Sequence, residues 1–358
     1  MTSAERIKML LNREIPDRMG VYEHWWGETI RDYWVNEGYP EGADVHDYFG
    51  YDMQGAGGWL DTTPFRIEPE VVEETDQWRV TRDGRGAVLK HWKNKSGTPQ
   101  HLEFEVKDPE TWKKYKEPLL ATDRARLGID QARADLEKVR ATGRFAFLGN
   151  TILVEQLRGM LGDLVWLPSL LLEPAWIHDF NRTYIDFYKR HYDLLFAEVG
   201  LPDGMFLYDD LGFRNGPFFS PAVMQSLFLP YFREIVGFFH DYGLPVILHT
   251  CGDVRPLVPY IVEAGFDCLQ PMEAKAGNNV LEYAEQFRDR ICFMGNMNIT
   301  VWNTNDRARV REEIVPKLEA LKRMRASYIF HSDHSVPPDV RLATYEYALE
   351  LYREHGVY

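Results

Sequence analysis

Cysteine is scarce in this chain, which contains three among 358 residues. Three cysteines are too few for the disulfide framework of a small secreted domain and are typical of a protein kept in a reducing cytosol. Long apolar runs are missing too. The best candidate, Val165 to Trp176, is interrupted by prolines and Glu173, whereas a membrane span needs about 18 apolar residues. We therefore expect a cytoplasmic protein that does not enter a membrane.

Basic residues are outnumbered, because 41 Lys and Arg face 55 Asp and Glu for a net charge of −14. Nucleic acids and anionic membrane surfaces are bound through basic patches, so neither is expected as a partner. The first residues, MTSAERIKMLLNRE, contain no apolar signal-peptide core. A chain of this length buries enough surface to fold without disulfides or metals.

Short apolar segments alternate with helical patterns from residue 108 onward, which favours a parallel sheet with both faces covered. The segments interpreted as strands are Gly20–Glu23, Arg144–Gly149, Met205–Tyr208, Pro245–His249, Phe266–Gln270, Ile291–Gly295 and Tyr328–His331. They predict a single domain, residues 1–358, folded as a (β/α)₈ barrel with one strand unrecognised. A doubly wound open sheet remains compatible with the same pattern.

Residues 66–107 have a different pattern, with short β-rich stretches around Asp83-Gly84 and Ser96-Gly97 that are typical of hairpins. We expect a small antiparallel β insertion there. Upstream, Gly55, Gly57 and Gly58 follow no convincing strand and are interpreted as a loop. The pattern Thr2-Ser3-Ala4-Glu5 is a capping box that predicts a helix over residues 3–12.

Polar side chains follow nearly every predicted strand, at the end where barrel enzymes place their active sites. The strongest signal is His249-x-Cys251, because residues two apart on a strand point to the same side. An imidazole and a thiolate that converge are suited to zinc. A buried cysteine beside a core histidine is the alternative. Cys268 and Cys292 lie within apolar strands and are interpreted as core thiols.

Three further clusters contain residues suited to a functional site. His331-Ser332-Asp333-His334, followed by Ser335-Val336-Pro337-Pro338, predicts a stiff polar loop in which Asp333 either serves chemistry or binds backbone amides. Asp209 and Asp210 point to opposite sides, so one is expected to face the site and the other to cap the next segment. Tyr22, Trp25 and Trp26 either wall a pocket for a planar ligand or pack on the barrel mouth.

Several motifs together resemble one family. They are the opening TSAERIKMLLNREIPDR, Phe49-Gly50-Tyr51-Asp52, Glu155-Gln156-Leu157-Arg158-Gly159, Asp209-Asp210-Leu211-Gly212, His249-Thr250-Cys251-Gly252-Asp253 and Ser335-Val336-Pro337-Pro338. In order and spacing they resemble the uroporphyrinogen decarboxylase superfamily, which includes methylcobamide:coenzyme M methyltransferases and the methyltransferase components of anaerobic O-demethylases. The resemblance covers most of the chain and implies a distorted (β/α)₈ barrel.

Departures from the family pattern guide the expected function. True uroporphyrinogen decarboxylases have an arginine-rich segment after the first strand, where this chain has Glu23-His24-Trp25-Trp26-Gly27-Glu28-Thr29-Ile30-Arg31. An octa-anionic porphyrinogen would meet like charge there, so we expect no decarboxylation of it.

The resemblance to the methyltransferase branch implies a zinc site of His249, Cys251 and a third ligand, for which this chain has His334 instead of cysteine. Asp333, Glu155 or substrate would complete it, and a metal-free site remains an alternative. The expected catalytic residues are Asp210, Asp333 and Glu155. The expected substrate-binding residues are Tyr22, His24, Trp25, Trp26, Asp52, Asn150, Gln270 and Glu273.

The expected function is thus a zinc-dependent methyltransferase that moves a methyl group between a small molecule and a corrinoid held by a separate protein. One alternative is a metal-free decarboxylase or lyase on a smaller carboxylate, with Asp52 or Asp210 and His334 in acid/base roles. Another is a non-enzymatic corrinoid or tetrapyrrole binder. A homodimer is the default expectation for quaternary structure.

Overall fold

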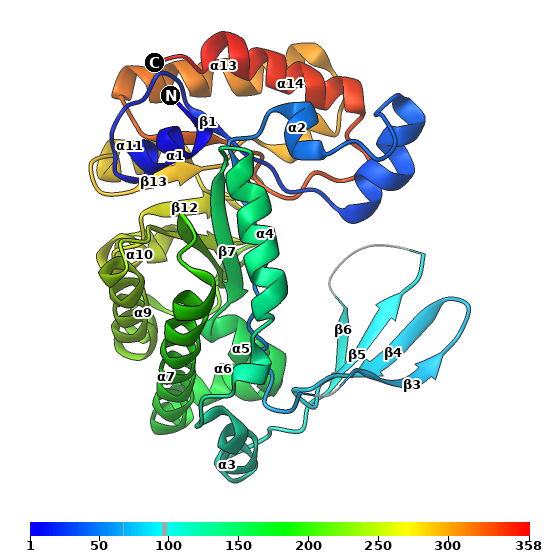
Figure 1. Cartoon of the computed structure of the whole chain (residues 1–358), viewed down its shortest axis with the longest axis vertical. Coiled ribbons are helices and arrows are strands. Elements are labelled where there is room, and N and C mark those ends of the chain that lie inside the picture. Colours follow the sequence, from blue (N-terminus) through cyan, green and yellow to red (C-terminus); the bar gives the residue numbers. More distant parts are fainter. Residues whose placement is uncertain (67, 95–98) are drawn as a thin grey trace.

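Eight parallel strands form the centre of the computed structural model, which describes residues 1–66, 68–94 and 99–358 (Figure 1). They are β1 (Gly20–Val21), β2 (Met53–Gly55), β7 (Phe145–Thr151), β8 (Gly204–Tyr208), β11 (Val246–Thr250), β12 (Cys268–Pro271), β13 (Cys292–Met294) and β14 (Tyr328–Phe330). Their order is β1-β14-β13-β12-β11-β8-β7-β2. Beside the seam between β1 and β2, the N–H of Asp52 donates to the carbonyl of Val21 at 2.8 Å. The sheet is therefore a nearly closed barrel, which confirms the predicted fold class.

The strand that the sequence pattern did not reveal is β2. It has three residues, Met53-Gln54-Gly55, with no β-branched residue and no continuous apolar run. This strand is held by its pairing with β7 and is not favoured by its own sequence. Gly55 is the last residue of this strand, and Gly57 and Gly58 lie in the loop that follows. The interpretation that no strand precedes this loop was therefore wrong.

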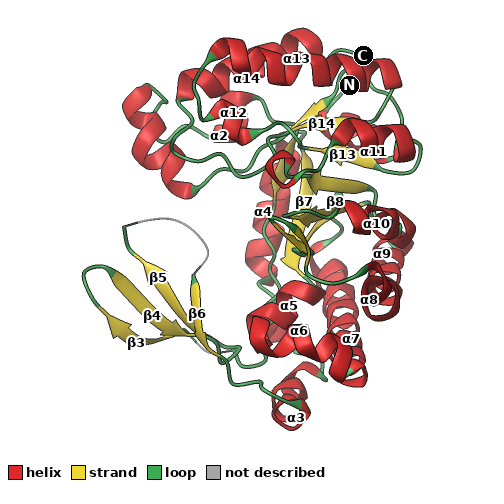
Figure 2. Cartoon of the chain, turned by 180° about the vertical axis from the view of Figure 1, so that it is seen from behind, coloured by secondary structure: helices red, strands yellow, loops and turns green. Residues whose placement is uncertain are grey.

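Helices surround the strands (Figure 2). They are α1 (Ser3–Leu11), α2 (Val45–Phe49), α3 (Pro109–Lys116), α4 (Ile129–Ala141), α5 (Leu153–Leu161), α6 (Asp163–Leu172), α7 (Pro174–Val199), α8 (Pro221–Val223), α9 (Leu229–Asp241), α10 (Val258–Ala264), α11 (Val280–Phe287), α12 (Ile299–Trp302), α13 (Arg307–Met324) and α14 (Leu342–His355). The predicted capping box of α1 is present: the Thr2 hydroxyl accepts from the N–H of Glu5, whose carboxylate accepts from the N–H of Thr2. Among the helices of the described residues, none combines the length and the apolar character needed to cross a bilayer.

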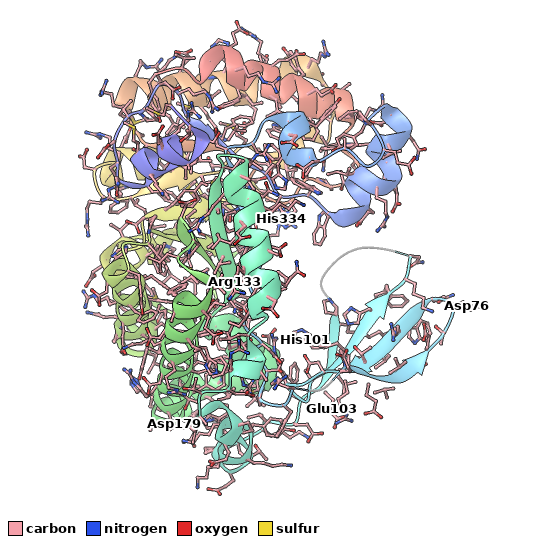
Figure 3. All side chains as sticks on the ribbon, viewed as in Figure 1. Asp76, His101, Glu103, Arg133, Asp179 and His334 are labelled. Atoms are coloured by element: carbon pink, nitrogen blue, oxygen red, sulfur yellow. The ribbon has the colours of Figure 1, made fainter. Side chains whose placement is uncertain are left out.

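The predicted insertion is an antiparallel sheet that stands to one side of the barrel in both views (Figures 1 and 2). Its strands are β3 (Glu70–Glu74), β4 (Trp78–Arg82), β5 (Val88–Trp92) and β6 (Gln100–Glu103). The carboxylate of Asp83 accepts from the N–H groups of Arg85 and Ala87 and closes the turn between β4 and β5. Figure 3 labels Asp76 at the outer end of this sheet. The second turn signal, Ser96-Gly97, lies outside the described residues.

Asp52 lies at the amino end of β2, opposite the end where substrate is expected. Its side chain is fully buried. One carboxylate oxygen accepts from the Arg6 guanidinium at 2.9 Å, and the other accepts from Arg18 at 2.7 Å and from the N–H of Val21 at 3.0 Å. The prediction that Asp52 binds substrate or acts in acid/base chemistry was wrong, because this carboxylate braces the closed end of the barrel.

Replacement of Asp52 by alanine is expected to lower the free energy of unfolding by about 3 kcal/mol or more, because the buried Arg6 guanidinium loses a counter-charge. Urea titration followed by circular dichroism measures this change. Asp32→Ala is the control, since the Arg31–Asp32 pair is exposed and surface pairs contribute about 1 kcal/mol or less. Equal losses in the two variants would contradict the bracing role.

Candidate active site

Neighbouring strand ends place three side chains in one row. In the parallel ladders, His249 on β11 lies opposite Tyr208 on β8 and opposite Gln270 on β12. Residues in register on adjacent strands point to the same face of a sheet. The rings of Tyr208 and His249 are in contact, with centroids 5.2 Å apart. The row lies at the carboxyl ends of the strands, where barrel active sites are built.

His249 and Cys251 converge as their spacing predicted. The Sγ atom of Cys251 lies 3.4 Å from Nε2 of His249, and Oδ1 of Asp210 lies 3.5 Å from the same nitrogen. Asp210 also accepts from the N–H of Cys251 at 2.8 Å. Zinc bonds of about 2.3 Å to sulfur and about 2.0 Å to nitrogen, in tetrahedral geometry, separate two ligand atoms by about 3.5 Å. The two distances from Nε2 of His249 are therefore those expected between ligands of one zinc ion.

His334 belongs to a second, overlapping group. Ligand atoms of Cys251, Glu273 and His334 lie within 4.8 Å of one another, as do those of Asp210, His249 and Cys251. Within the described ranges, no cluster contains both His249 and His334. The ligand set expected from the sequence is thus divided between two groups that share Cys251. His334 lies on the barrel, where Figure 3 labels it, and its ring packs beside that of Trp26.

Two carboxylates, those of Asp210 and Glu273, lie close to Cys251. Burial and the negative charges of Asp210 and Glu273 hold the pKa of the Cys251 thiol well above its ordinary value. Burial, followed by the charge of Asp210, also raises the pKa of Glu155, although Arg158 pairs with Glu155 at 2.9 Å. All five side chains line one cleft of about 660 Å³. A buried thiol among carboxylates favours a cation, which would stabilise the thiolate.

Asp209 and Asp210 divide their roles as their alternation predicted. Asp210 faces the cleft beside Cys251. Asp209 is fully buried and accepts from the N–H of Glu155 in the first turn of α5. Desolvation raises the pKa of Asp209 well above its ordinary value. Asp209 therefore positions α5, and with it Glu155, at the edge of the cleft.

Asp333 has a bracing role. Its side chain is buried, and its two oxygens accept from the N–H groups of Ile299 and Ala274, at 2.8 and 2.9 Å. It thereby holds the start of α12 to the loop after β12. The bonds to backbone amides agree with the structural alternative left open for Asp333, and its catalytic role stays a prediction.

A second cavity, of about 450 Å³, lies on the other side of Tyr208. It is lined by Tyr22, His24, Gly55, Gly57, Gly58, Phe147, Gly149, Asn150, Thr151 and Tyr208. None of these side chains carries a formal charge, because burial lowers the pKa of His24 well below its ordinary value. A Cβ atom on Gly149 would lie 3.0 Å from the Tyr208 ring. The glycines keep the cavity open, a role that the sequence pattern did not suggest.

The other predicted substrate-binding residues have varied positions. Tyr22, His24 and Asn150 line the uncharged cavity. Glu273 lines the cleft beside Cys251. Trp25 stacks instead on Tyr51, with ring centroids 5.8 Å apart.

Gln270 is 1% exposed. Its amide oxygen and nitrogen contact His249 and His331. In this structure it contacts both histidines, and its contact with substrate stays a prediction.

Two buried side chains behind the cavity were not predicted as site residues. Glu23 accepts from the hydroxyl and the N–H of Ser332 and from the N–H of His24. Burial raises the pKa of Glu23 to about 8 and lowers that of His331 to about 3. Glu23 ends the first predicted strand and His331 the last, so their positions in the pattern were the available signal.

Glu23 is expected to make stability fall as pH rises. Between the ordinary pKa of 4.5 and about 8, the folded protein holds a proton that the unfolded chain has lost. The free energy of unfolding then decreases with pH, by at most about 1.4 kcal/mol per pH unit. Glu23→Gln should flatten this decline in urea titrations from about pH 5 to about pH 8. Glu41→Gln, at an exposed position, should keep the wild-type slope, and an unchanged slope in Glu23→Gln would contradict the shift.

Comparisons with known proteins agree with this architecture. Residues 203–355 match the family model of uroporphyrinogen decarboxylase (URO-D). No curated protein sequence matches the chain. Among solved structures, a methyltransferase from Methanosarcina mazei is similar in fold, with 14% sequence identity, 99% of each chain covered and a TM-score of 0.67.

Two further solved structures are only weakly similar to this chain. A Xaa-Pro dipeptidase has 13% identity, coverage of 62% of this chain and 56% of its own, and a TM-score of 0.32. An endo-β-mannanase/endo-β-glucanase from Prevotella bryantii has 10% identity, coverage of 65% and 40%, and a TM-score of 0.35.

The matched residues 203–355 include the Asp209-Asp210, His249-x-Cys251 and Ser335–Pro338 segments that carried the resemblance. Residues 203–355 are therefore similar to the family that these motifs resemble, and the fold of the whole chain agrees with that similarity.

Proposed function

We propose that the protein is a zinc-dependent methyltransferase that moves a methyl group between a small substrate and a corrinoid carried by a separate protein. The observation that carries the proposal is the 3.4 Å approach of Cys251 Sγ to His249 Nε2 at the carboxyl ends of the strands, beside the cleft that Cys251 lines. The sequence resemblance to the cobalamin-dependent branch supports it. The Methanosarcina mazei protein of similar fold is described as a methyltransferase, which is consistent with the proposal.

His249 and Cys251 would supply two zinc ligands, and Asp210 is in position to supply a third. His334 and Glu273 adjoin Cys251 from the other side, so His334 would be the third ligand if its ring turned toward the metal. Bound zinc would supply a Lewis acid that stabilises negative charge on the substrate heteroatom.

The remaining groups of the cleft would bind substrate and hold a proton. Glu155 keeps a proton more readily than an exposed carboxyl because its pKa is raised, and it would protonate the heteroatom when the methyl group departs. Arg158 fixes its carboxylate. The uncharged cavity beside Tyr208 would enclose the apolar part of a small, neutral substrate and exclude water from it.

A metal-free lyase that acts on a small carboxylate is the second candidate. Arg158, Arg214 and Lys275 line the same cleft, and guanidinium and ammonium groups are suited to a carboxylate. In this case Asp210 or His334 would act as acid or base without a metal. Asp52 no longer contributes, because it lies at the other end of the barrel.

Turnover separates these functions. Purified protein with reduced cobalamin and a panel of neutral methyl donors should form methylcobalamin, which is followed by its absorption spectrum. Glu155→Gln should lower kcat by about 10²-fold or more, because general acid catalysis contributes about that factor. Glu137→Gln, at an exposed site on α4, is the control. Release of CO₂ from a carboxylate without metal, or formation of coproporphyrinogen from uroporphyrinogen, would contradict the proposal.

Metal content gives an independent test. Protein purified without chelator should contain about one zinc per chain, and Cys251→Ser should lose most of it, because a serine hydroxyl stays protonated at neutral pH and is a poor ligand for zinc. Cys292→Ser is the matched control, since Cys292 is a core thiol on β13. Elemental analysis measures both. Absence of zinc from the wild type, or equal zinc in both variants, would favour the metal-free lyase.

Zinc affinities measured for three variants would identify the third protein ligand. Asp210→Asn and His334→Ala are both expected to weaken binding, whereas His334→Cys should bind zinc at least as tightly as the wild type, because thiolate is a good zinc ligand. Equal affinity in the wild type and both His334 variants would remove His334 from the metal site and leave Asp210 as the third ligand.

A further inference from the structure

A chain of hydrogen bonds begins at the backbone carbonyl of Ser332. Nδ1 of His331 lies 2.6 Å from this oxygen, and a carbonyl oxygen can only accept, so Nδ1 of His331 carries a hydrogen. The ring is fully buried, and burial keeps it neutral, with a pKa of about 3. In a neutral imidazole only one nitrogen carries hydrogen. Nε2 of His331 is therefore an acceptor.

Gln270 connects His331 to His249 by hydrogen bonds. Its amide nitrogen lies 3.3 Å from Nε2 of His331, and its amide oxygen lies 2.5 Å from Nδ1 of His249. Nε2 of His331 accepts from the NH₂ group of Gln270, and it also lies 3.3 Å from Oε1 of Glu23. The amide oxygen of Gln270 faces His249 and can only accept. Nδ1 of His249 then donates to that oxygen. The lone pair of His249 is left on Nε2, the atom that faces Cys251 and Asp210.

We propose that Gln270 and His331 are positioning residues that hold His249 in the tautomer with hydrogen on Nδ1 and a bare Nε2. This inference rests on the proposed zinc site, since a bare nitrogen is what a metal needs from histidine, and its other nitrogen is commonly held by an outer hydrogen-bond partner. His24 reinforces the arrangement, because its Nδ1 lies 3.2 Å from Nε2 of His331.

Burial makes this series of hydrogen bonds select one tautomer of His249. Gln270 is 1% exposed and His331 is 0% exposed, so bulk water has little access to replace a lost partner. In the opposite tautomer of His249, the lone pair of Nδ1 would face the amide oxygen of Gln270. If the Gln270 amide rotated instead, its oxygen would face the lone pair on Nε2 of His331. Each arrangement sets two buried acceptors against each other, which is unfavourable.

The test reads the tautomer directly in the metal-free protein. Long-range ¹H–¹⁵N spectra of ¹⁵N-histidine-labelled enzyme should show hydrogen on Nδ1 of His249. Gln270→Met, of similar size but with no hydrogen-bonding amide, should give a mixture of tautomers and weaken zinc binding about 10- to 100-fold. Gln156→Met is the matched control, because Gln156 is also buried but bonds Thr62 and Thr151. It should leave both readouts unchanged.

Two further variants keep the inference testable if Gln270→Met fails to fold. Gln270→Glu retains an oxygen acceptor for Nδ1 of His249, and its second oxygen, protonated in this buried site, can donate to Nε2 of His331, so this variant should rescue the wild-type tautomer. His331→Leu removes the acceptor that orients the amide and should give a mixture. Hydrogen on Nε2 of His249 in the wild type, or wild-type spectra in both Gln270→Met and His331→Leu, would overturn the inference. A wild type with the expected tautomer but no affinity for zinc would instead contradict the proposed function alone.

Discussion

The parallel register of β7, β8, β11 and β12 is the constraint on which the site depends. It places Thr151, Tyr208, His249 and Gln270 opposite one another in successive strand pairs. A shift of one residue in any pair would turn the affected side chains to the other face of the sheet. Cys251 then follows two residues after His249, on the same side, so the metal-binding pair results directly from the end of β11.

This row separates two environments with different chemistry. On one side, the cavity that contains Tyr22, His24 and the glycines carries no formal charge. On the other side, Glu155, Asp210 and Glu273 surround Cys251. Tyr208 contacts both, because it lines the uncharged cavity and its ring packs on His249. In the proposed methyl transfer, the apolar part of the substrate and its reacting heteroatom would occupy these two environments.

Much of the barrel could be predicted from the sequence, because its strands are apolar runs bounded by turns. β2 could not, since its order comes from pairing with β7 and not from its own residues. The His249–Cys251 approach was predictable because both residues lie on one strand end. The contacts of Asp52, Asp333 and Gln270 involve partners distant in sequence, namely Arg6, Ile299 and His331, so residue type alone could not reveal them.

The central claim is that Cys251 and His249 bind one zinc ion. Zinc K-edge X-ray absorption of the purified protein measures this most directly, because scattering distinguishes sulfur from nitrogen and oxygen. The account predicts one sulfur at about 2.3 Å and two or three nitrogen or oxygen atoms at about 2.0 to 2.2 Å. A first shell without sulfur, or a protein that takes up no zinc, would contradict it.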